Sequence, residues 1–122
     1  MLARFREQLA LYSTPPHLLT SGEDGRAHAV ATTLTWDGEQ LLLSAGKRSL
    51  ANVAARKLVS VLWAAPNNDA YSLIVDGEAE ISGVGEQAQV RITITRAVLH
   101  RPGAPLSTGA SVCGSDCVPL FG

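Results

Sequence analysis

Charge is scarce in this sequence of 122 residues, and neither sign dominates. Charged residues make up 17% of the chain, below the roughly 25% of an average domain. Ten Lys and Arg stand against eleven Asp and Glu, which gives a net charge of −1. This balance argues against a general attraction to nucleic acid or to an anionic membrane. Because 46% of the residues are apolar, the composition also excludes intrinsic disorder.

Long apolar runs are missing as well. The longest strongly apolar stretch without a charge lies within residues 58–65, far short of the roughly 20 residues that a membrane-spanning helix needs. The first residues carry Arg4, Arg6 and Glu7 and lack the apolar segment of a secretory signal. The sequence therefore predicts a cytoplasmic protein that has neither a membrane nor a nucleic acid as partner.

Cysteine is rare, and its two copies, Cys113 and Cys117, lie together in the segment VCGSDC. Two cysteines are too few for a disulfide scaffold and are typical of a reducing compartment. They also fail to complete a tetrahedral metal site, and the three histidines are scattered along the chain. We interpret both cysteines as buried, inert or incidental, although a transient disulfide is an alternative, and we predict no metal site.

Apolar periodicity predicts a helix over residues 1–14, because one of its faces collects apolar side chains at spacings of three and four. These side chains are Leu2, Phe5, Leu9 and Tyr12. Pro15 and Pro16 end the helix. A second, short helix is expected over residues 49–56, with Ser49 as its N-cap.

The rest of the chain reads as short β-strands separated by turns. Six runs have this character: residues 17–21, 27–36, 41–44, 58–64, 70–81 and 88–100. Glu23-Asp24-Gly25 and Asp37-Gly38 are hairpin signals, because glycine freely adopts the positive φ that such turns need. We predict one domain over residues 1–122, a mainly β, six-stranded antiparallel barrel with an irregular tail over residues 102–122.

Two of the predicted strands differ in how their apolar residues are arranged. Residues 90–95 alternate between apolar and polar, which indicates one buried face. Residues 58–63 are nearly all apolar, which predicts a strand covered on both faces. Trp36 and Trp63 stand in strands, and we assign them to packing.

A local cluster of positive charge stands out from the neutral average. Lys47, Arg48, Arg56 and Lys57 supply four of the ten cations, and no acid occurs between positions 39 and 69. Lys47, Arg48 and Ser49 fall where a strand ends and a helix begins, so cations, a hydroxyl and free backbone N–H groups converge there. A phosphate suits such a site. The alternative is an ordinary solvated loop with an N-cap.

Residues 27–83 resemble the pyridoxamine 5'-phosphate oxidase-like, FMN-binding split barrels. The segments that carry the resemblance are DGRAHAVATTLTWDGEQLLLS, GKRSLANVAARKLVSVLW and YSLIVDGEAEI, in this order and spacing. The resemblance implies a six-stranded split barrel, to which the residue pattern adds the N-terminal helix and the short helix between the third and fourth strands. It also implies a homodimer that holds two flavins in clefts at the subunit interface, with FMN as the expected cofactor.

Carried over position by position, the resemblance implies a set of cofactor-binding residues. Arg48, beside Lys47, matches the phosphate-binding arginine, and Ser49 stands where many members have lysine. Family oxidases commonly have arginine at the position of His28 and lysine at that of Thr33, so the substrate is left open as an unidentified small molecule. The full set is Val30, Ala31, Thr32, Thr33, Leu43, Ser44, Lys47, Arg48, Ser49 and, from the partner subunit in this scheme, Ser72.

The function that this resemblance implies is that of a flavin-dependent oxidoreductase, with no side chain assigned to catalysis. A deazaflavin-dependent reductase is one alternative. A non-catalytic barrel that binds flavin or haem is another, because the position of Ser49 lacks the lysine of many members.

Overall fold

The computed structural model describes residues 2–67, 69–102 and 115–122. Its helices are α1 (Ala3–Leu9), α2 (Lys47–Ala55) and the single 3-10 turn η1 (Gly85–Gln87). The strands in these residues are β1 (His17–Ser21), β2 (Ala27–Ala31), β3 (Leu34–Asp37), β4 (Gln40–Ser44), β5 (Leu58–Trp63), β6 (Ser72–Ser82), β7 (Gln89–Pro102) and β8 (Ser115–Phe121).

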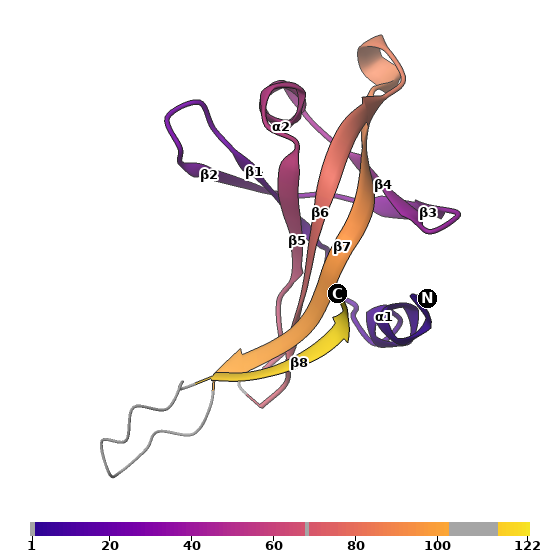
Figure 1. The fold of residues 1–122 in the computed structure, drawn as a ribbon, viewed down its shortest axis with the longest axis vertical. Coiled ribbons are helices and arrows are strands. Elements are labelled where there is room, and N and C mark those ends of the chain that lie inside the picture. The colour runs from indigo at the N-terminus through magenta and orange to yellow at the C-terminus, as the bar shows by residue number, and fades with distance from the viewer. Residues whose placement is uncertain (1, 68, 103–114) are drawn as a thin grey trace.

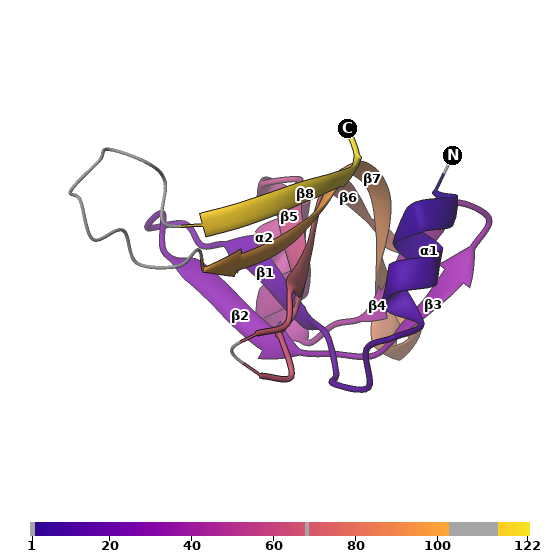
Figure 2. The same cartoon turned by 90° about the horizontal axis from the view of Figure 1, so that it is seen from below.

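The described strands form one antiparallel sheet in the order β2-β1-β5-β6-β7-β4-β3, with β8 added alongside β7. The two edge strands, β2 and β3, are consecutive in the chain and are separated only by Thr32 and Thr33. The sheet must therefore curl until its edges approach each other, as Figures 1 and 2 show. This arrangement confirms the predicted mainly β, antiparallel split barrel.

The strand count differs from the prediction in two places, giving eight strands in the described residues instead of six. The run over residues 27–36 is two strands, because the backbone changes partners at Thr32 and Thr33. Thr32 N donates to Pro16 O at 2.9 Å, and Ser44 N donates to Thr33 O at 3.1 Å. The expected irregular tail contains β8, which pairs with the end of β7; residues 103–114 lie outside the described part.

Both helices begin and end at residues other than those predicted. Helix α1 ends at Leu9, because the following residues make tighter turns in which Tyr12 N donates to Leu9 O at 3.1 Å. Helix α2 begins two residues earlier than expected, with Gly46 as its N-cap. Ser49 therefore lies in the first turn, where it is buried, and does not cap the helix.

Helix α1 closes one end of the barrel with the predicted apolar face. Phe5 is fully buried and meets the rings of Trp36 and Trp63 edge-on, at centroid distances of 5.6 and 5.9 Å. The Arg6 guanidinium carbon lies 3.9 Å from the centroid of the Trp36 ring. Such aromatic contacts add to burial of apolar area, and they confirm that both tryptophans serve packing.

The two strand patterns have different outcomes. On β7, Val90, Ile92 and Ile94 are buried and the residues between them are not, as predicted. On β5, only Val59, Val61 and Trp63 are buried. The expectation that both faces of β5 are covered is wrong for the described residues of this chain, because the outer side of the strand stays exposed or half-exposed and Leu58 is 67% exposed.

Gly77 marks a point at which β6 and β7 come too close for any side chain. The register shifts between Asp76 and Gly77, and a Cβ at Gly77 would lie 2.5 Å from Ile92 Cγ2 and 2.6 Å from Thr93 O. Thr93 O is a backbone atom, and moving it away from an added Cβ would cost free energy of folding.

We therefore expect Gly77→Ala to lower the free energy of unfolding by about 1–3 kcal/mol in urea or thermal unfolding. Gly46→Ala is the matched control. Gly46 has φ −84° and no atom within 4 Å of an added Cβ, so its change should cost less than about 1 kcal/mol, the preference of an N-cap for glycine over alanine. Equal stability of the two variants would contradict the close approach at Gly77.

Candidate functional site

The point where the chain crosses between the two sheet edges lies beside an open hollow of about 750 Å³. This volume is in the range of roughly 300–1,000 Å³ that is usual for small-molecule sites. Residues from β2, the Thr32–Thr33 crossing, the end of β4 and the start of α2 line it. They are His28, Val30, Ala31, Thr32, Thr33, Ser44, Ala45, Gly46, Lys47, Arg48 and Ser49.

The start of α2 brings positive character to this hollow. Gly46 is extended and no side chain caps the helix, so the first backbone N–H groups of α2 are left for a ligand or water. Lys47 and Arg48 follow directly, and both are exposed. In the described residues neither forms an ion pair. An anion placed here would meet N–H donors, the helix dipole and two cations together.

Hydroxyl groups line the side of the hollow nearest the crossing. Thr33 Oγ1 and Ser44 Oγ lie 3.1 Å apart and are both exposed. Thr32 is buried instead, and its hydroxyl donates to the Ser44 carbonyl. Thr32 thus fixes β4 against the crossing, while Thr33 and Ser44 present hydrogen-bonding groups to a ligand.

Two predicted contact residues have supporting positions. Leu43 is fully buried in the core and does not line the hollow. Ser49 lines it, but the side chain is only 1% exposed. Leu43 and Ser49 therefore support the hollow from the packed interior, and a ligand would contact the exposed lining residues instead.

Only part of the positive cluster seen in the sequence reaches the hollow. Arg56 Nε donates to Ser21 O at 2.7 Å, which ties the end of α2 to β1. Lys57 pairs with Glu78 at 2.8 Å, and this hydrogen bond raises the pKa of the Lys57 ammonium. Lys47 and Arg48 are therefore the two members of the cluster that are available to a ligand in this hollow.

A buried polar contact holds α2 in place. Asn52 Nδ2 donates to Thr20 Oγ1 at 3.0 Å, and both side chains are buried. The contact joins the middle of α2 to β1, so it sets where the helix start points. Sequence periodicity did not identify Asn52, because a buried amide reveals itself only when its partner is known.

Ser72 lies elsewhere in this chain. It begins β6, where Ser72 Oγ accepts a hydrogen bond from Ala65 N at 3.0 Å, and it does not line the hollow. Its expected contact with a cofactor therefore needs a second subunit and stays a prediction.

A second hollow, of about 920 Å³, adjoins the first on the far side of the two cations. His28, Lys47 and Arg48 line both hollows. The β1–β2 turn forms the opposite wall with Glu23, Asp24 and Arg26, where Arg26 pairs with Asp24 at 3.5 Å.

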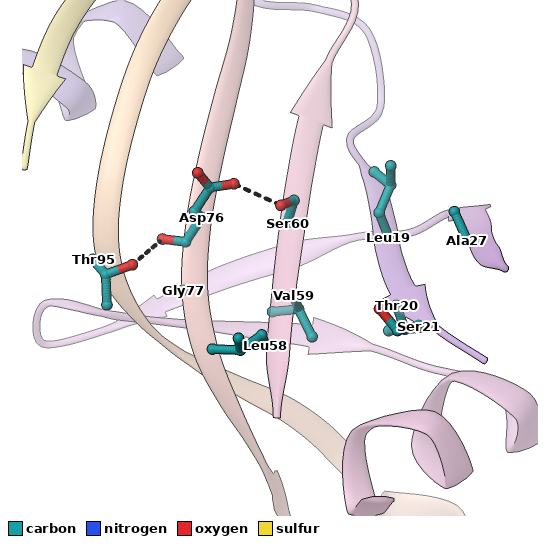
Figure 3. A pocket seen from close by; sticks show the side chains of 10 residues that line it. All are labelled: Leu19, Thr20, Ser21, Ala27, Leu58, Val59, Ser60, Asp76, Gly77 and Thr95. Carbon is teal, nitrogen blue, oxygen red and sulfur yellow. Dashed lines mark hydrogen bonds between the residues drawn. The ribbon is translucent and has the colours of Figure 1, made fainter. Parts of the chain in front are cut away.

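A third hollow, of about 380 Å³, lies on the outer face of the sheet (Figure 3). Leu19, Leu58 and Asp76 are among its lining residues. The Asp76 carboxylate accepts a hydrogen bond from Ser60 at 2.6 Å and lies 3.8 Å from Arg96, so it is already satisfied. Asp76 is the one charged residue among those that line this hollow, so the hollow offers a ligand no unpaired charge.

Metal-ligating side chains do not gather in the part of the chain that the structure describes: no group of three His, Cys, Asp or Glu is close enough to hold an ion. In the same residues, no helix has the length and apolar character to span a membrane.

Solved structures show the class of fold to which this chain belongs. It overlays an F420 reductase with a TM-score of 0.59 and 21% identity, covering 75% of this chain and 94% of that one. A general stress protein 26-related protein of the pyridoxinephosphate oxidase family from Clostridium acetobutylicum gives 0.65 and 16%, covering 82% and 87%. HupZ of group A Streptococcus gives 0.60 and 14%, covering 77% and 90%. All share the split-barrel fold.

Sequence comparison places the chain more narrowly. No family model matches it. It is 35% identical over 116 residues to the uncharacterized protein Mb0449c of Mycobacterium bovis, and equally to MT0457 of Mycobacterium tuberculosis. Each alignment covers 84% of this chain and 82% of the relative. The chain belongs to the same family as these two mycobacterial proteins.

Loss of the Asn52–Thr20 contact should loosen α2. We expect Asn52→Ala to lower the free energy of unfolding by about 1–3 kcal/mol, because the Thr20 hydroxyl keeps its burial and loses its donor. The double variant Thr20→Val, Asn52→Leu removes both polar groups and should recover at least half of that loss in urea unfolding. An Asn52→Ala chain as stable as the unchanged one would show that this contact does not hold the helix.

Proposed function

We propose that the chain binds a flavin-type cofactor in the hollow at the crossing and acts with it as an oxidoreductase on a small molecule. The carrying observation is the meeting of an uncapped helix start, Lys47 and Arg48 with a hydroxyl pair and an apolar strand in one hollow. The donors gathered there are those that a sugar phosphate attached to a flat ring requires.

The phosphate would lie at the start of α2. A phosphate monoester carries about two negative charges near neutral pH, and the two exposed cations with the free N–H groups match that charge. Ser49 Oγ is too deeply buried to replace the lysine that many related barrels carry here, so we assign the main role to Arg48, with Lys47 beside it.

The ring and its polyol chain would follow the crossing. Val30 and Ala31 supply apolar wall, and the exposed hydroxyls of Thr33 and Ser44 can bond a polyol. When bound, a flavin or deazaflavin supplies the redox chemistry. The chain's own residues would bind the cofactor, orient it and shield it from water, and no side chain is assigned as an acid or base.

A second copy of the chain would complete the site. Ala31, Thr33, Ser44, Lys47 and Arg48 are all exposed, so one chain alone leaves a cofactor in this hollow open to water. On the outer side of β5, Leu58 is exposed and Leu62 half-exposed, as expected of a surface that a partner buries. We therefore propose a homodimer in which the partner contributes Ser72.

One observation favours a deazaflavin coenzyme as the second candidate. The adjoining hollow continues beyond Lys47 and Arg48, so a cofactor that extends past its phosphate has room there. The F420 reductase among the fold relatives points in the same direction.

Arg48→Ala tests the phosphate position. Titration of the purified chain with FMN and with the deazaflavin coenzyme, followed by fluorescence or calorimetry, should show at least a tenfold weaker binding of the preferred cofactor. Loss of a charged hydrogen bond costs about 1.5–3 kcal/mol, and about 1.4 kcal/mol is tenfold.

Arg4→Ala is the matched control, because it removes the same charge from the exposed side of α1 and should leave affinity unchanged. If Arg48→Ala and the unchanged chain bind the cofactor with equal affinity, the phosphate does not lie beside Arg48. Haem is titrated in the same way. Binding of haem alone would favour the non-catalytic barrel, and a chain that binds neither FMN, nor the deazaflavin coenzyme, nor haem would refute the proposal.

Leu58→Asp tests the dimer. A carboxylate in an apolar interface should raise the dimer dissociation constant at least about tenfold, measured by analytical ultracentrifugation. Leu11→Asp is the control, because Leu11 is similarly exposed, at 75% against 67%, and lies just beyond α1. If the two variants dissociate alike, β5 is not in the interface.

A further inference from the structure

A thiol and an imidazole meet on the β7–β8 hairpin, outside the cofactor hollow. His100 and Cys117 are directly opposite each other in the antiparallel register. Directly paired residues project from the same face of a sheet, and His100 Nδ1 lies 3.2 Å from Cys117 Sγ. The pairing is thus set by the hairpin register, and it joins side chains that are 17 positions apart in sequence.

The sulfur is open to reagents. Cys117 is a free, exposed cysteine, so the expectation that it is buried is wrong. Strand β8 pairs with β7 alone among the described strands. Packing does not require a thiol at such a position, because an exposed side chain on an edge strand buries little area. A base within hydrogen-bond distance is, by contrast, the arrangement that converts a cysteine into a nucleophile.

We propose that Cys117 and His100 form a reactive thiol site that undergoes exchange with low-molecular-weight disulfides. The Cys117 thiol passes its proton to His100 Nδ1, and the resulting thiolate attacks one sulfur of the disulfide. A new S–S bond forms at Cys117 while the original S–S bond breaks. The departing thiolate takes the proton back from His100, so charge and electrons balance with the disulfide as the oxidant.

Within one chain, this site lies apart from the hollow proposed for the cofactor. The end of β7 and the start of β8 lie at the opposite end of the molecule from α2 (Figure 1). None of the residues that line that hollow is His100 or Cys117. Ser72, which the partner would contribute to the cofactor in the proposed homodimer, is the β6 neighbour of His100. Thiol exchange is therefore measured without cofactor and the cofactor titrations without disulfide, so that the two proposals can fail separately.

The experiment uses the full, reduced chain and dipyridyl disulfide, whose released pyridinethione reports the rate by absorbance. Cys113→Ser should keep one rapidly reacting thiol per chain, and Cys117→Ser should lose that rapid phase. With oxidised glutathione, the intact mass of the Cys113→Ser chain should rise by one glutathionyl group.

His100→Gln, made in the Cys113→Ser chain, tests the base. Without a base beside the thiol, exchange should slow at least about fivefold, and added imidazole should restore part of the lost rate. An unchanged melting temperature shows that folding is intact. If this variant does not fold, His100→Asn in the same chain takes its place.

Two results would overturn the proposal. The first is equal exchange rates in the Cys113→Ser and Cys117→Ser chains. The second is an exchange rate that does not change when His100 is replaced.

Discussion

The crossing of Thr32 and Thr33 from one edge of the sheet to the other is the constraint on which the molecule depends. Two residues span at most about 7 Å, so the edges formed by β2 and β3 must approach each other and the sheet must curl. The buried Thr32 hydroxyl ties this crossing to β4, and Thr32 N ties it to the chain before β1. The same curl encloses the aromatic core and opens the hollow in which a cofactor would lie.

The electrostatics of that hollow depend on which cations are already engaged. Arg56 and Lys57 belong to the same sequence cluster as Lys47 and Arg48, but they bond to Ser21 and Glu78. The Asn52–Thr20 contact holds α2 so that the remaining two cations and the free N–H groups face one hollow. A chain with a net charge of −1 can therefore attract an anion locally, because a ligand responds to the nearby field and not to the average.

Prediction from sequence succeeded where a pattern repeats along the chain. Alternation predicted the buried face of β7, and helical spacing predicted the inner face of α1. It failed where the decisive partner is remote. The run over residues 27–36 has uniform β character, so its division at Thr32 became visible only with Pro16 and Ser44 in place. The predictions for the outer face of β5 and for the segment that forms β8 failed for the same reason, because burial and strand pairing depend on neighbours that are remote in sequence.

Residue patterns were enough to predict a mainly β antiparallel fold, the hairpin turns at Gly25 and Gly38, and the charged segment at the start of α2, because each rests on local propensity. Which polar groups meet depends on how the strands pair in the folded sheet. The hydroxyls of Thr33 and Ser44 lie opposite each other because the β3–β4 register continues one residue beyond Leu34 and Leu43, and the imidazole of His100 reaches the thiol of Cys117 because of the β7–β8 register. A one-residue slip in that register would turn one of the two side chains to the opposite face.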